Sequence, residues 1–239
     1  MIEIPSLRPE TRYGIPPADQ VLFNREYIIG YSYLFRQPRW AMQLIDPKNQ
    51  VANVDRTDSF RADMRIPNQF QSELRDYRGS GFDRGHLVPS ADRRETAIKN
   101  SETFLLSNMS PQAPEFNRQI WRILEEKVRD LAKKYVEVYA ISGPYFEVGE
   151  TIQTIGTEGE VVVPHGYFKS VLAESVRGKM DIWSFMLPNE ETDRPISDFL
   201  AKTTDVEIRT GLPLWDRLRD PKAQKMMNTK KRRTWFREQ

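Results

Sequence analysis

Hydrophobic residues fall into short runs separated by polar segments, which is the pattern of a domain built from several short strands. In residues 27–46 the runs YIIGYSYLF and WAMQLI flank the segment RQPR, and this arrangement predicts two strands joined by a turn. The alternating segment at residues 135–141 predicts another strand, ending at the Ser-Gly-Pro of residues 142–144. Further strands are predicted at residues 104–108, followed by a loop at 109–114, and at 161–164, 167–173, 180–187 and 205–209.

One helix is clearly indicated by its periodicity. Between residues 115 and 134, apolar side chains recur at the helical spacing and define a core-facing stripe made of Ile120, Leu124, Val128 and Leu131. A shorter helix is predicted at residues 195–202, with Pro195 near its start. Strands and helices together predict an α+β fold with a central antiparallel β-sheet flanked by helices.

The chain divides into three parts by composition. Residues 1–20 are rich in proline and predict an extended N-terminal arm, residues 21–220 form a single domain, and residues 221–239 form a basic C-terminal tail. The tail carries KKRR followed by Trp235 and Phe236, which suits either a nucleic-acid contact or a solvated, frayed terminus. The long polar segment at residues 47–80 leads into the most informative motif, so we interpret it as functional.

Composition excludes several classes of protein. The chain has 239 residues, 38% of them hydrophobic and 29% charged, and no apolar run approaches the roughly 20 residues that cross a bilayer. With no cysteine, a metal ion would have to be held by oxygen atoms or histidine. The net charge of +2 means that nucleic acid would meet local rather than global positive charge. Neither a signal nor a transit peptide is visible, which leaves the localisation open.

Local positive charge surrounds a compact motif, Asp-Arg-Gly-His, at residues 83–86. His86 is one of two histidines, and a histidine can exchange protons near neutral pH, so it is a candidate general base. Arg84 could hold a phosphate through paired N–H donors. The other histidine, His165, is the rival base, but its place after Pro164 at a predicted strand break favours a structural role.

The predicted helix supplies a second group of polar residues. Asn117, Trp121 and Glu125 are spaced four residues apart and therefore share one face. An amide oxygen such as that of Asn117, together with substrate phosphate, suffices for magnesium, which keeps much of its water. Glu125 could then accept hydrogen bonds from metal-bound water. Taken alone, each residue has an ordinary alternative, because asparagine often caps helices and glutamate often lies on their solvated faces.

Three segments, which follow one another along the chain in the same order as in the family, resemble a known family. They are DYRGSGFDRGHL at 76–87, FLLSNMSPQ at 104–112 and FNRQIWRILE at 116–125. They are similar to the DNA/RNA non-specific endonucleases, which are ββα-metal or His-Me finger nucleases, and most similar to endonuclease G. Weaker likeness extends over most of residues 13–215, including the segments YGIP, FRAD, SGP and VPHGYFK. The resemblance implies an α+β fold that carries a ββα-metal motif.

The resemblance also implies roles for individual residues. His86 matches the general base, Asn117 the only direct protein ligand to magnesium, and Glu125 a carboxylate that orients metal-bound water. Arg84 matches the arginine of the motif, and Asn108 an asparagine beside the site that positions its neighbours. An upstream arginine that holds the scissile phosphate in some relatives has two counterparts here, for which Arg61 is the first choice and Arg56 the second.

The implied activity is a Mg²⁺-dependent, sugar-non-specific endonuclease, with Mn²⁺ as a substitute metal. It would cut DNA and RNA through backbone contacts, leaving 5′-phosphate and 3′-hydroxyl ends. Candidate protein partners are a second copy in a homodimer and a protein inhibitor. Two alternatives stay open: a nucleic-acid-binding module that has lost catalysis, and the same nuclease used as a toxin or defence effector.

Overall fold

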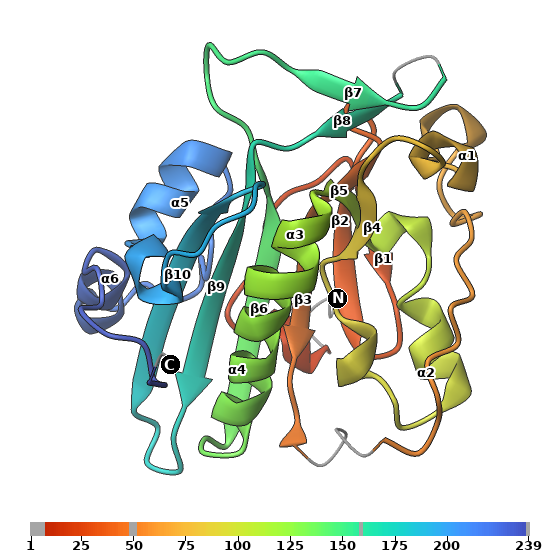
Figure 1. The fold of residues 1–239 in the computed structure, drawn as a ribbon. Coiled ribbons are helices and arrows are strands. Elements are labelled where there is room, and N and C mark those ends of the chain that lie inside the picture. The colour runs from red at the N-terminus through yellow and green to blue at the C-terminus, as the bar shows by residue number, and fades with distance from the viewer. Residues whose placement is uncertain (1–7, 48–51, 158–159, 238–239) are drawn as a thin grey trace, which may run out of the picture.

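A twisted, seven-stranded antiparallel sheet forms the centre of the molecule (Figure 1). The computed structural model describes residues 8–47, 52–157 and 160–237. In the order β1-β2-β3-β6-β9-β10-β11, the strands are Gln20–Phe23, Tyr27–Ser32, Gln37–Leu44, Glu137–Tyr145, Gly166–Glu174, Met180–Pro188 and Leu200–Ala201. The antiparallel pairing agrees with the predicted fold class.

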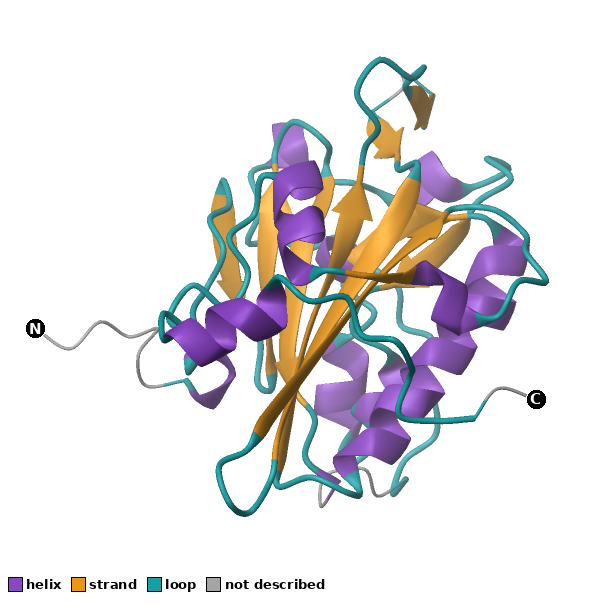
Figure 2. Ribbon diagram, turned by 90° about the vertical axis from the view of Figure 1, so that its left-hand side faces the viewer, coloured by secondary structure: helices purple, strands orange, loops and turns teal. Residues whose placement is uncertain are grey.

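Helices cover both faces of this sheet (Figure 2). Because side chains alternate along a strand, Val138 and Ala140 of β6 point to one face and Tyr139 and Ile141 to the other. The first face packs against α4 (Arg122–Ala132), and the second against α5 (Thr203–Thr210) and α6 (Pro221–Met227). Two smaller helices, α1 (Leu74–Tyr77) and α2 (Ala97–Glu102), belong to the connections between strands.

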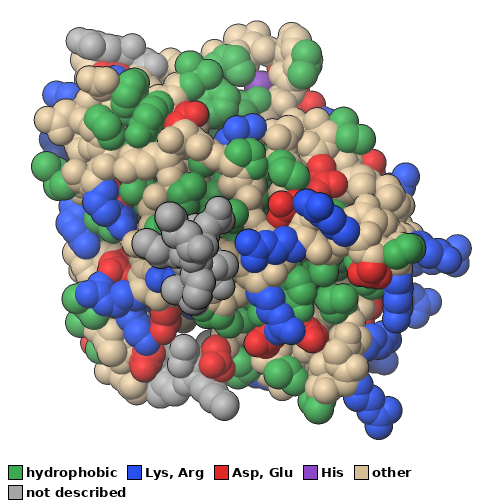
Figure 3. Space-filling view, turned by 180° about the vertical axis from the view of Figure 1, so that it is seen from behind, with side chains coloured by type: hydrophobic (Ala, Val, Ile, Leu, Met, Phe, Trp, Pro, Cys, Tyr) green, Lys and Arg blue, Asp and Glu red, His purple; other side chains and the backbone are tan. Residues whose placement is uncertain are grey.

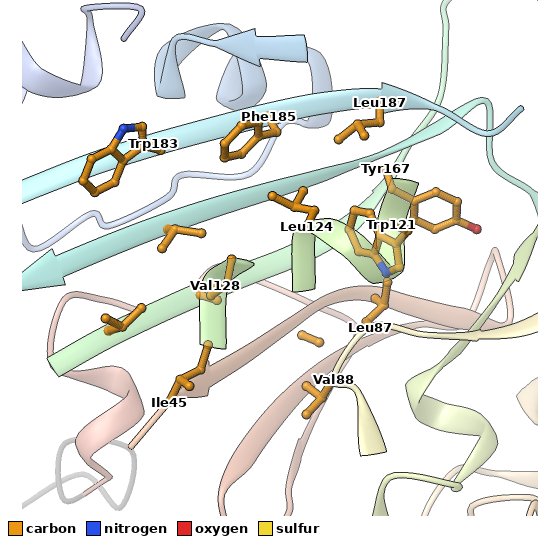
Figure 4. Packing of buried hydrophobic residues seen from close by; sticks show 14 of the residues in the cluster. Ile45, Leu87, Val88, Trp121, Leu124, Val128, Tyr167, Trp183, Phe185 and Leu187 are labelled. Atoms are coloured by element: carbon orange, nitrogen blue, oxygen red, sulfur yellow. The ribbon is translucent and has the colours of Figure 1, made fainter. Parts of the chain in front are cut away.

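The predicted apolar stripe fixes α4 on the first face. Leu124 and Val128 project toward the aromatic and aliphatic side chains of β9 and β10 (Figure 4). Leu124 is completely buried and Val128 nearly so. Burial of one such side chain contributes about 1.5–3 kcal/mol. The opposite face of the helix is thereby turned away from the sheet and is available for chemistry.

A second, two-stranded sheet lies beside this helix. Strand β4 (Asp83–His86) pairs antiparallel with β5 (Met109–Gln112), so that Asp83 lies opposite Gln112 and His86 opposite Met109. The chain then enters α3 (Pro114–Phe116), a π-helical turn (Asn117–Trp121) and α4. Two strands followed by a helix form the ββα unit that the motifs predicted.

The structure exchanges the strand and the loop that were predicted for residues 104–114. Residues 104–108 were expected to be a strand, but Leu106–Asn108 is a 3₁₀ turn. The strand is β5, in the segment expected to be a loop because of its prolines. Each strand of a two-stranded sheet is an edge strand, and an edge strand tolerates the missing N–H of Pro111.

Other predicted strands also differ. Residues 161–163 form β8 (Val161–Val163), which pairs with β7 (Gln153–Ile155) in a separate hairpin instead of the central sheet. Its valines bury against a small cluster with Leu106 and Met109. The strand expected at residues 205–209 is wrong, because α5 occupies this segment. Its alternating apolar residues do not share a buried face: Val206 is buried and Ile208 is exposed. Strand β6 continues through the Ser-Gly-Pro that was expected to end it. The short helix predicted at residues 195–202 is instead a 3₁₀ turn, Ile196–Phe199, which leads into β11.

Aromatic side chains hold both terminal segments against the sheet. Tyr13 packs edge-on against Tyr139, with ring centroids 5.1 Å apart. Near the other end, Trp235 packs against Trp183 and donates a hydrogen bond from Nε1 to the carbonyl of Lys127 at 2.9 Å. The basic tail is therefore anchored by its aromatic residues rather than frayed, up to residue 237.

None of the helices in the described ranges combines the length and apolar character that a bilayer crossing requires.

Candidate active site

A cleft of about 530 Å³ lies between β4, the α4 helix and the segment that follows β4. Its walls are dominated by charged side chains. The lining residues are Arg56, Arg84, His86, Pro89, Ser90, Ala91, Asn117, Arg118, Arg122, Glu125, Glu126 and Arg129. Four of the residues singled out from the sequence, Arg84, His86, Asn117 and Glu125, therefore meet in one cavity.

Strand geometry explains how His86 reaches the cleft. Arg84 and His86 are two residues apart on β4 and so project to the same side. The imidazole packs edge-on against Phe104 and Phe60, with centroids 5.0 and 5.8 Å away. The indole Nε1 of Trp121 donates to the backbone carbonyl of His86 at 3.3 Å, which joins the strand to the helix.

This environment favours the neutral form of His86. The ring Nε2 is buried and has no hydrogen-bond partner within the described part of the chain. Burial, with smaller effects from the charges of Arg56 and Arg84, lowers the pKa of His86 to about 3. The imidazole is thus unprotonated at neutral pH, which is the state that a general base requires.

The shifted pKa of His86 gives the protein a defined response to acid. The unfolded chain binds a proton at His86 below about pH 6.5, whereas the folded protein does not until about pH 3. As the pH is lowered from about 6.5 to about 3, the free energy of unfolding should therefore fall, by at most about 1.4 kcal/mol per pH unit from this group. Urea titrations from pH 7 to pH 4 should show a smaller fall for His86→Gln than for the wild type. Equal falls would contradict the assigned shift.

Asn117 is oriented by a hydrogen bond at the beginning of the π-helical turn. Its Nδ2 donates to Oδ2 of Asp83 at 2.9 Å, which leaves the amide carbonyl oxygen as the remaining acceptor of the side chain. Asp83 also accepts two hydrogen bonds from Arg118, at 2.8 and 2.7 Å. The first residue of the DRGH motif therefore sets the orientation of the amide.

Glu125 carries an unsatisfied oxygen. Its Oε1 is buried and has no hydrogen-bond partner among the described residues. Burial raises the pKa of the Glu125 carboxyl, and the positive charge of Lys169 opposes this effect. Lys169 belongs to β9 and is buried; it donates to Ser142 Oγ at 2.6 Å and lies over the Trp121 ring at 4.4 Å.

These donors fit a hard divalent cation that retains most of its water. No cluster of three or more His, Cys, Asp or Glu side chains suited to a metal ion occurs in residues 8–47, 52–157 and 160–237. An oriented amide oxygen at Asn117 and an unpartnered carboxyl oxygen at Glu125 instead match the preference of magnesium for a few oxygen ligands. The site offers no ligand set for a fully protein-coordinated zinc.

The two candidate upstream arginines lie in different places. Arg56 lines the cleft, stacks over Phe104 at 4.8 Å and donates to Ser90 Oγ at 3.2 Å. Arg61 does not line the cleft, and its Nη1 is bound by the backbone carbonyls of Ser59 and Ser101 at 2.9 and 3.0 Å.

Asn108 and His165 also lie outside the cleft lining. Asn108 is fully buried and bonds both backbone groups of Val88, accepting from N at 3.0 Å and donating to O at 2.9 Å, so it fixes the segment after His86. His165 bonds the backbone of Glu147 and Thr151, each at 3.2 Å.

Three further arginines of the site were not singled out from the sequence. Arg118, Arg122 and Arg129 project into the cleft from the π-helical turn and α4. Their signal was present, since they share the helical spacing of Glu125 on the face opposite the apolar stripe. Each of them pairs with a carboxylate, Arg118 with Asp83, Arg122 with Glu126 and Arg129 with Asp92, so this wall of the cleft carries charges of both signs.

The fold and the cleft define a phosphodiester hydrolase of the ββα-metal class: a ββα unit that presents a neutral imidazole, an oriented amide oxygen and several arginines. Residues 7–221 match the DNA/RNA non-specific endonuclease family. The chain belongs to this family, which confirms the resemblance found in its motifs. It is an endonuclease acting on nucleic acid, and it requires a divalent metal ion.

Several relatives are similar over most of their length. Nuclease C1 of Cunninghamella echinulata var. echinulata is 37% identical over 220 residues, covering 87% of each chain. Human mitochondrial endonuclease G is 32% identical over 212 residues, covering 84% of this chain and 71% of the relative. A chain in the crystal structure of the EndoG/EndoGI complex superposes with a TM-score of 0.85 at 33% identity, covering 94% of this chain and 97% of that one.

Proposed function

We propose that the protein is a Mg²⁺-dependent, sugar-non-specific endonuclease in which His86 is the general base and Asn117 is the protein ligand to the metal ion. The observation that carries this proposal is the convergence of the two halves of the site on one cleft. His86 comes from β4 and Asn117 from the turn before α4, and the Trp121 hydrogen bond connects them.

The reaction assigns a task to each group. Neutral His86 takes a proton from water, the water oxygen bonds to phosphorus, and the bond from phosphorus to the 3′ oxygen breaks. The products are a 5′-phosphate and, after protonation of the leaving oxygen, a 3′-hydroxyl. Asn117 would hold a divalent ion through its amide oxygen, and the bound ion would supply positive charge for the leaving oxygen. Glu125 would orient the water of that ion, and Arg84 would stabilise the negative charge of the phosphate.

Arg56 is the better candidate than Arg61 for the scissile phosphate. The Arg56 guanidinium lies at the cleft beside Phe104 and within the electrostatic reach of His86, and its carboxylate contact, to Asp58 at 2.6 Å, is half-exposed on both sides. Arg61 would first have to give up two hydrogen bonds to backbone carbonyls. We therefore assign phosphate contact to Arg56 and a role in holding the upstream segment to Arg61.

Lack of sequence preference follows from the chemistry of the cleft lining. Arginines recognise phosphate groups, which occur at every nucleotide and carry no sequence information. On the far side of the molecule, basic side chains gather mainly along the edge where α5 and α6 lie, and the rest of that face mixes charges of both signs (Figure 3). We assign cleavage to the arginine-lined cleft and expect salt to inhibit it.

A plasmid-nicking assay tests the proposal against a binding module that has lost catalysis. Supercoiled DNA should be nicked and then degraded with Mg²⁺ or Mn²⁺ present, and EDTA should abolish this. A structured RNA should also be degraded, and the fragments should carry 5′-phosphates. Binding without cleavage at any metal concentration would favour the binding module.

One candidate partner, a protein inhibitor, is supported by the structural comparison. The EndoG/EndoGI structure describes inhibition of EndoG, and this supports a protein inhibitor as a partner of the present chain. The homodimer and the use as a toxin or defence effector stay predictions from the resemblance.

A further inference from the structure

A second cavity, of about 280 Å³, lies at the beginning of the DRGH strand. It is lined by Leu74, Tyr77, Arg78, Phe82, Asp83 and Arg84. Arg84 lines both cavities, so a chain that enters the cleft passes this guanidinium to reach the second one. The smaller cavity has about half the volume of the cleft and suits one unit of such a chain.

The loop that forms this cavity is fixed by its own hydrogen bonds. Ser80 Oγ donates to the carbonyl of Tyr77 at 2.9 Å and accepts from the backbone N–H of Phe82 at 3.1 Å. Gly79 and Gly81 both have left-handed backbone angles, with φ of 70° and 83°. Arg78 and Phe82 are therefore held at the rim of a preformed cavity.

Charge in this cavity is unbalanced. The Asp83 carboxylate is already bonded to Asn117 and Arg118. Within the described residues, neither Arg78 nor Arg84 forms a salt bridge, and Arg84 lies over the Phe60 ring at 4.2 Å. Two guanidinium groups thus border the cavity without an acidic partner.

The cavity also has two aromatic wall residues, Tyr77 and Phe82, beside Leu74. Tyr77 is 5% exposed and its hydroxyl is buried with no hydrogen-bond partner among the described residues. Phe82 is half-buried beside it and packs on the same small hydrophobic cluster. Arginines next to a partly exposed aromatic ring are the combination that binds single-stranded nucleic acid, through phosphate contacts and base stacking.

We propose that this cavity is a nucleotide subsite, which binds the phosphate of a nucleotide flanking the cleaved bond between Arg78 and Arg84 and its base or sugar against Phe82. The proposal rests on the proposed endonuclease function. It assigns the segment before the DRGH motif to substrate binding and makes Arg84 the group shared with the cleft.

Substrates with one uncharged linkage test the subsite. A single methylphosphonate is placed within a single-stranded oligonucleotide, and the cleavage rate of every bond is mapped by sequencing gel. In the wild type, the cleavage rate should fall at the uncharged linkage itself. It should also fall about tenfold at one other bond, a fixed distance away, which is the loss expected for one charge-assisted contact.

Matched variants identify the contact. Arg78→Ala should weaken the suppression at the distant bond, because only Arg84 then contacts that phosphate, and leave the suppression at the uncharged linkage itself. Arg75→Ala is the control, since Arg75 lies on α1, just before Arg78, but pairs with Glu73 and does not line the cavity. It should behave as the wild type does. Thermal melting of both variants verifies the fold, which is expected to persist because Arg78 is exposed.

The outcomes separate the two proposals. No distant suppression in the wild type, or the same distant suppression in Arg78→Ala, would overturn the subsite while normal cleavage of remote bonds upholds the endonuclease. A wild-type protein that cuts no bond would overturn both.

Discussion

Replacing His86 by alanine is expected to lower kcat for plasmid cleavage by about 10²–10⁴-fold, the usual contribution of a general base. The ring sits between two phenylalanines at the cleft with its Nε2 buried and unpartnered. Its lowered pKa of about 3 keeps the ring unprotonated at neutral pH. No other described histidine lines the cleft, so nothing replaces it. Single-turnover rates at saturating Mg²⁺ would measure the loss, and circular dichroism would verify the fold.

The second histidine provides a matched control. His165 bonds two backbone groups away from the cleft, and His165→Ala should keep most of the activity. If His165→Ala abolished cleavage and His86→Ala did not, the assignment of the base would be reversed.

Replacing Asn117 by alanine should lower the cleavage activity by a comparable factor, because the protein would bind the metal ion more weakly. Even residues that only support a metal ligand typically cost 10–100-fold in metal affinity or activity, and Asn117 is proposed to bind the ion directly. The concentration of Mg²⁺ needed for half-maximal cleavage should therefore rise by at least about tenfold. Direct Mn²⁺ binding, followed by electron paramagnetic resonance, should weaken in parallel.

Gln119→Ala controls for damage to the helix. Gln119 lies in the same π-helical turn but is exposed and lines a different cavity. Its variant should bind Mn²⁺ and cleave DNA as the wild type does. Unchanged Mn²⁺ affinity in Asn117→Ala would show that the ion is held elsewhere.

Local patterns sufficed to predict the two halves of the site. The short DRGH motif combines an imidazole and a guanidinium on one side of a strand, and the helix separates its apolar stripe from a polar face carrying Asn117 and Glu125. Both features depend on backbone periodicity, which can be read from residue spacing. The convergence of the halves became visible only in the pairing of β4 with β5.

Features that depend on contacts distant in sequence could not be predicted. The residues of β5, which include Pro111, favour a loop by themselves. They form a strand because β4 pairs with them. The sequence placed Arg61 ahead of Arg56, whereas the structure puts Arg56 in the cleft lining and Arg61 on two backbone carbonyls outside it. The buried position of Lys169 beneath Trp121 depends on how the sheet packs on the helix.

A crystal structure with Mg²⁺ and a short DNA duplex tests the central claim most directly. The expected result is a metal ion bound to the protein through the carbonyl oxygen of Asn117 alone, with water between the ion and Glu125. His86 should face the scissile phosphate, and Arg56 should contact it. A metal ion coordinated elsewhere, or a phosphate held by Arg61 away from His86, would contradict the account.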